Sequence, residues 1–103
     1  MTANVLVLYN PPADPAAFNS HYFGTHVPLA KKIPGLRSIS VSEGPVNAMT
    51  PGASYHLIAE LVFDSMADLQ AGMASPEGQA TGADLPNFAA AGATILVYES
   101  QER

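Results

Sequence analysis

The stretch YHLIAELVFDS, residues 55–65, contains the strongest strand signal in the chain and ends where a helix can begin. Residues 55–63 are mostly apolar and carry the β-branched and aromatic side chains that strands favour. Ser65 follows, and together with Asp68 it forms a capping-box-like start for a helix. The stretch therefore predicts a strand followed directly by a helix. One face of that helix carries three apolar residues that we expect in the core: Met66, Leu69 and Met73.

Three other segments are typical of strands and lie on both sides of this one. Residues 4–9 (NVLVLY) and 93–99 (ATILVYE) are apolar on both faces, whereas residues 36–44 (LRSISVSEG) alternate between apolar and serine positions. Residues 45–54 contain two prolines and a glycine and predict a loop. Residues 75–92 are rich in glycine and proline, so we expect short helical pieces joined by turns there.

A first helix is expected between the first two strands. Asp14 is a suitable N-cap, and Pro15 suits the first helical position. The helix should continue to about Lys32, with a disturbance at Pro28, because proline offers no N–H to the preceding turn. The Pro-Gly pair at 34–35 should end it.

The element order β-α-β-β-α-β predicts an α+β, ferredoxin-like fold with a four-stranded antiparallel sheet, in a single domain spanning residues 1–103. Both helices would cover the same face of the sheet, which leaves apolar side chains on the other face. A chain this small should not expose such a surface to water. We therefore expect a homodimer in which a second copy covers the open sheet face.

Composition limits the partners of the protein. Nine acidic residues against four basic ones give a net charge of −5, which argues against nucleic acid and anionic membranes, since both need clustered cations. The chain has no cysteine, His21 and His26 do not form a metal pair and have no carboxylate close by in sequence, and the three histidines form no cluster, so no metal site is expected. The N-terminus lacks the basic segment of a signal peptide, and no run is long enough to span a membrane. We expect a cytoplasmic protein.

The stretch HYFGTHVPLAKKIPG, residues 21–35, supplies the main candidate for chemistry. On an ideal helix at about 100° per residue, His26 falls inside the apolar face, on the same side as Tyr22. His21 falls on the solvent side, beside Lys32. An inward imidazole needs a hydrogen-bond partner, and its pKa is easily moved across neutrality. His26 is therefore either a structural core residue or a general acid/base, and His21 is expected to be solvated.

Other polar positions also have two interpretations. His56 either lines a cleft or ends the strand in which it lies. Asp84 and Phe88, four residues apart, are either ligand-binding residues or a helix cap with a core aromatic. Glu60, within an apolar strand, is either functional or part of an edge or interface salt bridge. No phosphate-binding glycine loop and no nucleophile elbow is present.

Along essentially its whole length the sequence resembles the EthD-type family of the dimeric α+β barrel superfamily. The first part of the likeness is an aromatic residue followed by His-x-Pro-Leu and Pro-Gly-Leu; the second part is Phe-Asp-Ser, Ser-Pro-Glu and Asp-x-x-x-Phe. These motifs are carried by Tyr22, His26, Pro28, Leu29, Pro34, Gly35, Leu36, Phe63, Asp64, Ser65, Ser75, Pro76, Glu77, Asp84 and Phe88. The resemblance implies a ferredoxin-like subunit whose sheet forms a barrel with that of a second copy. The family is named after a protein associated with the degradation of ethyl tert-butyl ether.

The resemblance implies several functions, since similar barrels include isomerases, decarboxylases, cyclases and cofactor-free monooxygenases, and others bind haem. Our leading hypothesis is a cofactor-independent enzyme that acts on a small, largely apolar carbonyl or aromatic compound, with His26 as the general acid/base. Its pocket would lie between the first helix and the sheet. The substrate-binding candidates are Tyr9, Tyr22, His56, Asp84 and Phe88. The alternatives are a non-catalytic small-ligand or accessory protein and a haem-binding barrel.

Overall fold

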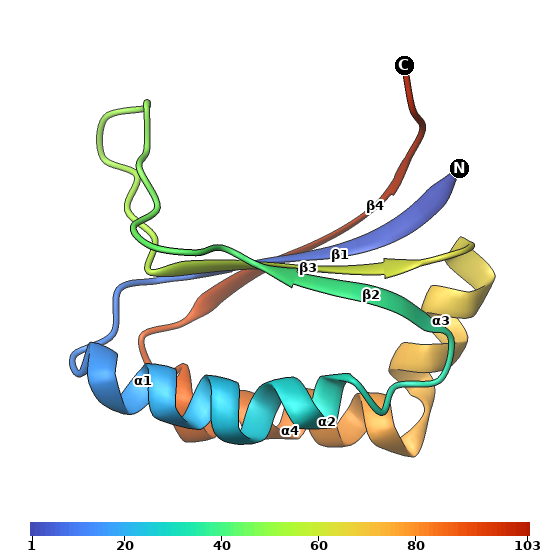
Figure 1. Ribbon diagram of the computed structural model, residues 1–103, viewed down its shortest axis with the longest axis horizontal. Helices are drawn as coiled ribbons and strands as arrows, with labels where there is room; N and C mark the ends of the chain where they lie inside the picture. Colours follow the sequence, from blue (N-terminus) through green and yellow to red (C-terminus); the bar gives the residue numbers. More distant parts are fainter.

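All helices lie on one face of a four-stranded antiparallel sheet in the computed structural model, which describes residues 1–103 (Figure 1). This arrangement confirms the predicted α+β, ferredoxin-like fold. The elements along the chain are β1 (Thr2–Tyr9), α1 (Pro15–His21), the π-helical segment η1 (Tyr22–His26), α2 (Val27–Ala30), β2 (Leu36–Val41), β3 (Leu57–Phe63), α3 (Met66–Ala74), α4 (Pro76–Phe88) and β4 (Ala93–Ser100).

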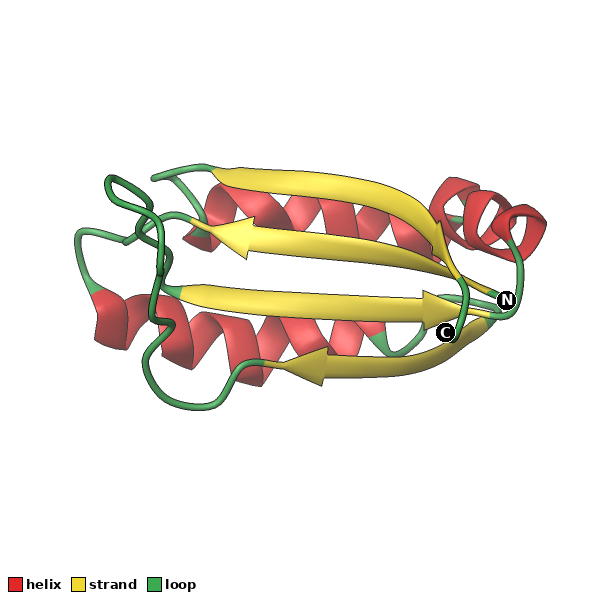
Figure 2. Ribbon diagram, turned by 90° about the horizontal axis from the view of Figure 1, so that it is seen from above, coloured by secondary structure: helices red, strands yellow, loops and turns green.

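The sheet has the strand order β2-β3-β1-β4, so the first and third strands of the chain lie in its centre (Figure 2). Every neighbouring pair is antiparallel, and the ladder is regular except for a bulge between Leu36 and Ser38. Alternate side chains of β1 and β3 point towards the helices and are buried. The core therefore lies between this face of the sheet and the helices, as expected from the apolar strands.

The elements α1, η1 and α2 are consecutive and form the first helical rod, which begins and ends as predicted. The Asp14 side chain accepts a hydrogen bond from the Ala17 N–H, and Gly35, with φ 82°, follows the last turn. The disturbance expected at Pro28 is the π-helical segment η1 directly before it, where the Val27 N–H bonds to the Tyr22 carbonyl five residues back. Proline donates no hydrogen bond and its ring crowds the preceding turn, so a wider turn at this point accommodates it.

The prediction of short helical pieces over residues 75–92 is wrong, because Pro76–Phe88 form one continuous helix. The helix begins at Ser75, whose hydroxyl accepts a hydrogen bond from the Gly78 N–H. Gly78 serves close packing rather than a turn, since a Cβ there would collide with the Gly72 carbonyl of α3. No helix of the structure combines the length and apolar character needed to traverse a bilayer.

The second face of the sheet has no helix on it, and residues 42–56 rise on that side (Figure 1). Its apolar side chains are half-buried or exposed: Leu6, Leu8, Ile58, Val62, Leu96 and Tyr98. Glu60 lies among them and accepts a hydrogen bond from the Tyr98 hydroxyl at 3.2 Å. These six apolar residues and Glu60 are called the open face below.

Candidate active site

Four buried aromatic rings from four different elements form the floor of the candidate site. They are Tyr9 of β1, Phe18 of α1, Tyr22 of η1 and Phe88 of α4. Their ring centroids lie 5.1 to 5.8 Å apart, the spacing of favourable edge-to-face and tilted pairs. Because helices and sheet all contribute, the cluster fixes the position of η1 relative to α4.

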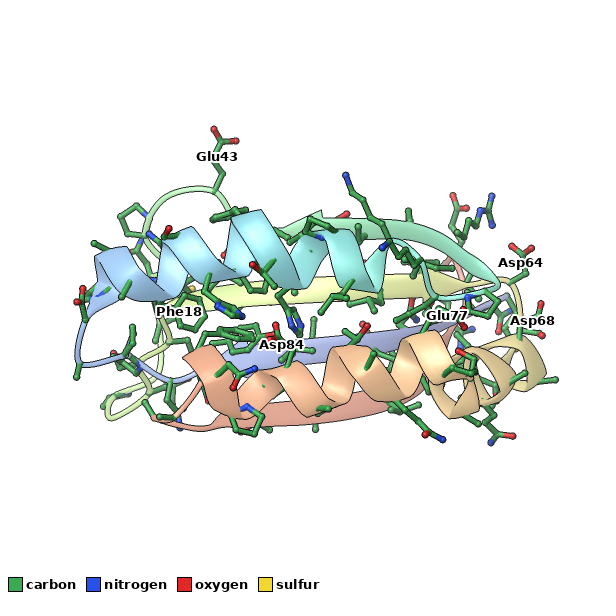
Figure 3. The ribbon with its side chains drawn as sticks, turned by 90° about the horizontal axis from the view of Figure 1, so that it is seen from below. Phe18, Glu43, Asp64, Asp68, Glu77 and Asp84 are labelled. Carbon is green, nitrogen blue, oxygen red and sulfur yellow. The ribbon has the colours of Figure 1, made fainter.

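His26 of η1 and Asp84 of α4 meet directly above this cluster. The His26 Nδ1 and the Asp84 Oδ2 are 3.0 Å apart, and the two side chains are only 6% and 7% exposed. The His26 ring packs on Phe88 at 4.6 Å and on Tyr22 at 5.5 Å. Figure 3 shows Asp84 between the two antiparallel helical rods, on the same side of the sheet as Phe18. His26 therefore faces inward, as predicted.

His21 also reaches Asp84, so the prediction that it is solvated is wrong. Its Nε2 lies 2.9 Å from the Asp84 Oδ1, its ring stacks on Phe88, and its side chain is 29% exposed. The error comes from placing residues on an ideal α-helix. In the π turn, residues five apart are one turn apart, which brings His21 and His26 towards the same side of the rod.

The Asp84 carboxylate accepts hydrogen bonds from both histidines and from the Asn87 side chain at 3.0 Å. Burial acts to raise the pKa of Asp84, but the hydrogen bonds from Asn87, His21 and His26 outweigh it and hold that pKa below its usual value. Burial lowers the pKa of His26, and the Asp84 hydrogen bond opposes it only in part. Near neutral pH the site therefore contains an ionised Asp84 and a neutral His26.

The ionised carboxylate determines which nitrogen of His26 carries the proton. A carboxylate without a proton can only accept hydrogen bonds, so the His26 Nδ1 must be the donor. The neutral ring then has a lone pair on Nε2, which forms no hydrogen bond within the protein. No group of three or more histidine, aspartate or glutamate side chains is arranged to hold a metal ion. The arrangement is that of an oriented imidazole base.

A small apolar cavity of about 90 Å³ lies beside His26, between the sheet and the helices. Tyr9, Tyr22, His26 and Thr81 supply its polar groups. The remaining lining residues are Val5, Val7, Ala30, Ile39, Ala59, Leu61, Met73, Gly82, Leu85 and Ile95. The cavity is smaller than one of about 150 Å³ that holds benzene, so it suits a compound of roughly four heavy atoms.

The hydroxyls of Tyr9 and Tyr22 have no hydrogen-bond partner in the protein, as is the case for the His26 Nε2. No enclosed side-chain nitrogen or oxygen lacks a partner, so these three atoms border accessible space, and all three residues line the cavity. Burial raises the pKa of Tyr22 to about 12. Burial also raises the pKa of Tyr9, and the nearby Tyr22 and Asp84 raise it further. Both phenols therefore stay protonated and can donate a hydrogen bond.

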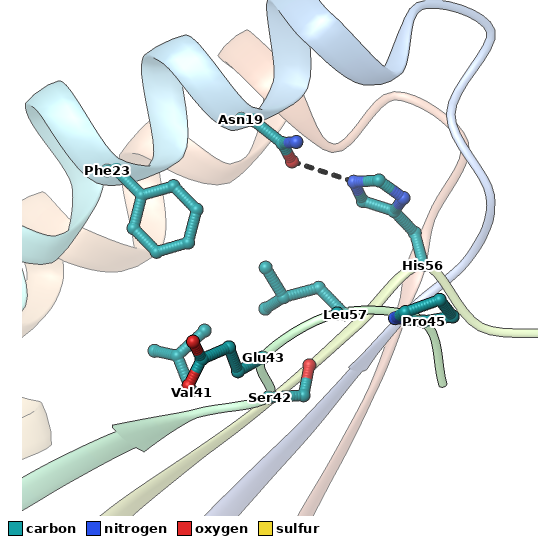
Figure 4. A pocket seen from close by; sticks show the side chains of 9 residues that line it. Asn19, Phe23, Val41, Ser42, Glu43, Pro45, His56 and Leu57 are labelled. Atoms are coloured by element: carbon teal, nitrogen blue, oxygen red, sulfur yellow. Dashed lines mark hydrogen bonds between the residues drawn. The ribbon is translucent and has the colours of Figure 1, made fainter. Parts of the chain in front are cut away.

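His56 lies apart from this group of residues. Its Nε2 bonds to the Asn19 Oδ1 at 2.8 Å (Figure 4). Its ring packs edge-to-face against Phe18, with the ring centroids 4.8 Å apart. It lines a separate, open cleft of about 480 Å³ together with Phe23 and Glu43. The structure thus brings together five of the six candidate residues, and His56 is the one that it leaves out: Tyr9, Tyr22, His26, Asp84 and Phe88.

Sequence reasoning missed two residues of the site, His21 and Asn87. The spacing of Asn87, three residues after Asp84, would have placed both on one side of a helix if residues 76–88 had been read as helical. For His21 the signal was Pro28, because a proline that interrupts a helix is a common site for a wider turn.

The fold and the site define a class of protein: a ferredoxin-like α+β protein with a histidine-lined cavity between helices and sheet. A protein from Jannaschia that is described as dimeric and ferredoxin-like has the same fold, with a TM-score of 0.69 and 21% identity over 97% of this chain and 100% of that chain. The cofactor-independent oxygenase SnoaB from Streptomyces nogalater also shares the fold, with a TM-score of 0.69 and 12% identity over 99% and 95% of the two chains.

Residues 10–92 match the EthD domain, and the chain belongs to the EthD family. An EthD family protein from Bacillus halodurans has a crystal structure that matches with a TM-score of 0.88 and 37% identity, over 98% of this chain and 100% of that one. An uncharacterised 11.0 kDa protein from the thcB–thcC intergenic region of Rhodococcus erythropolis is 41% identical over 97 residues, which is 94% of this chain and 93% of the relative. The resemblance seen in the sequence is thereby confirmed.

Proposed function

We propose that the protein is a cofactor-independent enzyme in which His26 abstracts and returns a proton on a small, largely apolar carbonyl compound. The observation that carries the proposal is the single free nitrogen of His26. Its Nδ1 is held by Asp84, its Nε2 forms no hydrogen bond within the protein, and the residue lines an apolar cavity. A base that is neutral, oriented and only 6% exposed is suited to proton transfer at neutral pH.

The chemistry follows from the groups around the cavity. The His26 Nε2 removes a proton from the carbon next to the carbonyl. The C–H electron pair forms the carbon–carbon double bond of an enolate, and the π pair of the carbonyl moves to its oxygen. The protonated Tyr9 and Tyr22 hydroxyls are suited to donate hydrogen bonds to that oxygen. The new imidazolium is stabilised by the adjacent Asp84 carboxylate. Isomerisation, decarboxylation and cyclisation of carbonyl compounds share an enolate of this kind. SnoaB, which has the same fold, is a cofactor-independent oxygenase.

Deuterium exchange tests the proposal without knowledge of the natural substrate. The protein is incubated in D₂O with acetone and with butanone, whose size suits the cavity, and loss of the α-protons is followed by proton NMR. We expect exchange faster than with free imidazole for at least one compound, and loss of that rate in His26→Gln. His56→Gln is the matched control and should retain it, because His56 lines a different cleft. Exchange that survives in His26→Gln would refute the mechanism.

A non-catalytic role in binding is the second candidate, and the mostly apolar lining of the cavity favours it. A carrier would be stabilised by small ketones in a thermal-shift assay, yet would promote no deuterium exchange. The haem alternative has no comparable support at His26, since the cavity there, about 90 Å³, lies below the roughly 300–1,000 Å³ of sites for drug-sized ligands. The cytoplasmic location stays a prediction, which cell fractionation tests.

The open face is the surface through which we propose that a second copy binds. Leu96 and Tyr98 belong to β4 and lie on the open face, where they are 46% and 38% exposed. Solved structures of the same fold are described as dimeric. Face-to-face packing of two sheets would bury these side chains and produce the barrel implied by the sequence resemblance.

A further inference from the structure

Gly82 stands in the middle of α4 without a structural reason in the residues around it. A Cβ added there would meet no atom within 4 Å, and the residue has no positive φ. Gly72 and Gly78 differ, because a Cβ at either would collide with a neighbouring backbone. Glycine in a helix interior is less stable than alanine. The chain thus keeps a costly residue at a position where alanine would fit.

Gly82 does line the cavity beside His26. It lies two residues before Asp84, which is about 200° around an α-helix, so it faces away from the two histidines. On that side α4 lies over β1 and the edge strand β4 (Figure 3). Gly82 and Ile95 of β4 are the exposed lining residues, and the others are buried or half-buried. The cavity therefore reaches the surface between α4 and β4.

We propose that the missing side chain of Gly82 forms the entrance of the cavity and limits its ligands to narrow, uncharged molecules. The rim beside Gly82 is made of Leu85 and Ile95, which offer no charge to a ligand. The four basic side chains of the protein belong to residues that do not line the cavity: Lys31, Lys32, Arg37 and Arg103. The inference rests on the proposed function only in taking the cavity as the ligand site.

Pro86 offers a competing explanation for the glycine. It lies four residues after Gly82, and a proline ring crowds the carbonyl four residues before it. If Gly82 served to relieve that crowding, an alanine there would destabilise the helix. If Gly82 serves as an entrance, alanine should stabilise the helix, and the larger leucine should obstruct the cavity. The two explanations therefore predict opposite shifts in Tm.

Xenon is a suitable probe, because it enters apolar cavities and needs no hydrogen bond. Its exchange with the protein is measured by ¹²⁹Xe NMR for the wild type, Gly82→Ala and Gly82→Leu. Gly24→Ala and Gly24→Leu are matched controls, since Gly24 is also a helical glycine with nothing within 4 Å and does not line the cavity. We expect Gly82→Leu to slow xenon exchange at least about tenfold and the Gly24 variants to leave it unchanged. Both alanine variants should raise Tm by about 3–6 °C.

Three results would overturn the inference: no xenon uptake by the wild type, equal exchange rates in wild type and Gly82→Leu, or a lower Tm in Gly82→Ala. Failure of the proposed function is separable from these results. If the protein admits xenon through Gly82 but catalyses no deuterium exchange, the entrance is supported and the enzymatic function is refuted. If its His26-dependent deuterium exchange is unaffected by Gly82→Leu, the enzymatic function is supported and the entrance is refuted.

Discussion

Replacing Asp84 by asparagine is the most informative single change in this protein. The carboxylate has two oxygens and accepts hydrogen bonds from His21, His26 and Asn87. Asparagine keeps one acceptor oxygen and turns the other position into an NH₂ donor. At least one histidine must then offer a lone pair to the amide. If that histidine is His26, its proton moves from Nδ1 to Nε2, and the cavity faces an N–H in place of a base.

The magnitude follows from these contacts. At least one hydrogen bond to a charged, buried acceptor is lost, which should cost about 1.5–3 kcal/mol of unfolding free energy. Deuterium exchange into a small ketone should fall by roughly 10³–10⁴-fold, the order found where the same change leaves a catalytic histidine in the wrong tautomer. Asp68→Asn is the control, because Asp68 is exposed on α3 and the change should leave exchange intact.

Long-range ¹H–¹⁵N NMR spectra of the histidine rings report the tautomer directly, and urea titration reports stability. We expect the Nδ1–H form of His26 in the wild type and the Nε2–H form in Asp84→Asn. The reasoning is refuted if the variant keeps the Nδ1–H form, or if it changes tautomer and retains the exchange rate. A variant that loses stability while exchange is unaltered would show that Asp84 is structural.

Four further predictions concern the pH dependence of exchange, the pH dependence of stability, the core and the open face. The rate of deuterium exchange should be constant above the lowered pKa of His26 and should fall as His26 becomes protonated. The inflection of the pH–rate profile should therefore lie below about 6.5, the ordinary pKa of histidine, and an inflection above that value contradicts the account. The pKa of Asp84 is depressed in the folded state, so the ionised carboxylate stabilises the fold fully above about pH 4, and this stabilisation is lost as the pH falls through the folded pKa. Urea midpoints measured from pH 2 to 6 should show this loss of stability in the wild type and not in Asp84→Asn. Phe88→Ala should lower the unfolding free energy by about 3–5 kcal/mol, since Phe88 packs against five rings. Urea titration measures this change, and a loss under about 1 kcal/mol would mean that the aromatic cluster does not support the fold. Leu96→Asp should convert the proposed dimer to a monomer in sedimentation experiments, whereas Ala83→Asp, at an exposed position of α4, should not. A dimer in both variants would place the interface elsewhere.

Local signals in the sequence were sufficient for most of the secondary structure. The alternation in the strands, the Asp14 and Ser65 caps and the stop at Gly35 all act over a few residues, so the order of elements and the ferredoxin-like fold could be predicted from them. The inward position of His26 followed from helical periodicity in the same way. The prediction for residues 75–92 was wrong because Gly78 is typical of a helix break. In the structure Gly78 lies inside a helix, and a glycine is needed there because α3 approaches closely.

The site itself was decided by tertiary structure. Asp84 lies far from His21 and His26 along the chain, and no local pattern links them. The widened turn at η1 rotates His21 towards α4, and the packing of α4 against η1 then brings both histidines to one carboxylate. Sequence determined which side chains were available and which elements carried them. Their hydrogen bonds, and the cavity that His26 lines, depend on distances of a few ångströms between elements, which only the packing of helices on the sheet sets.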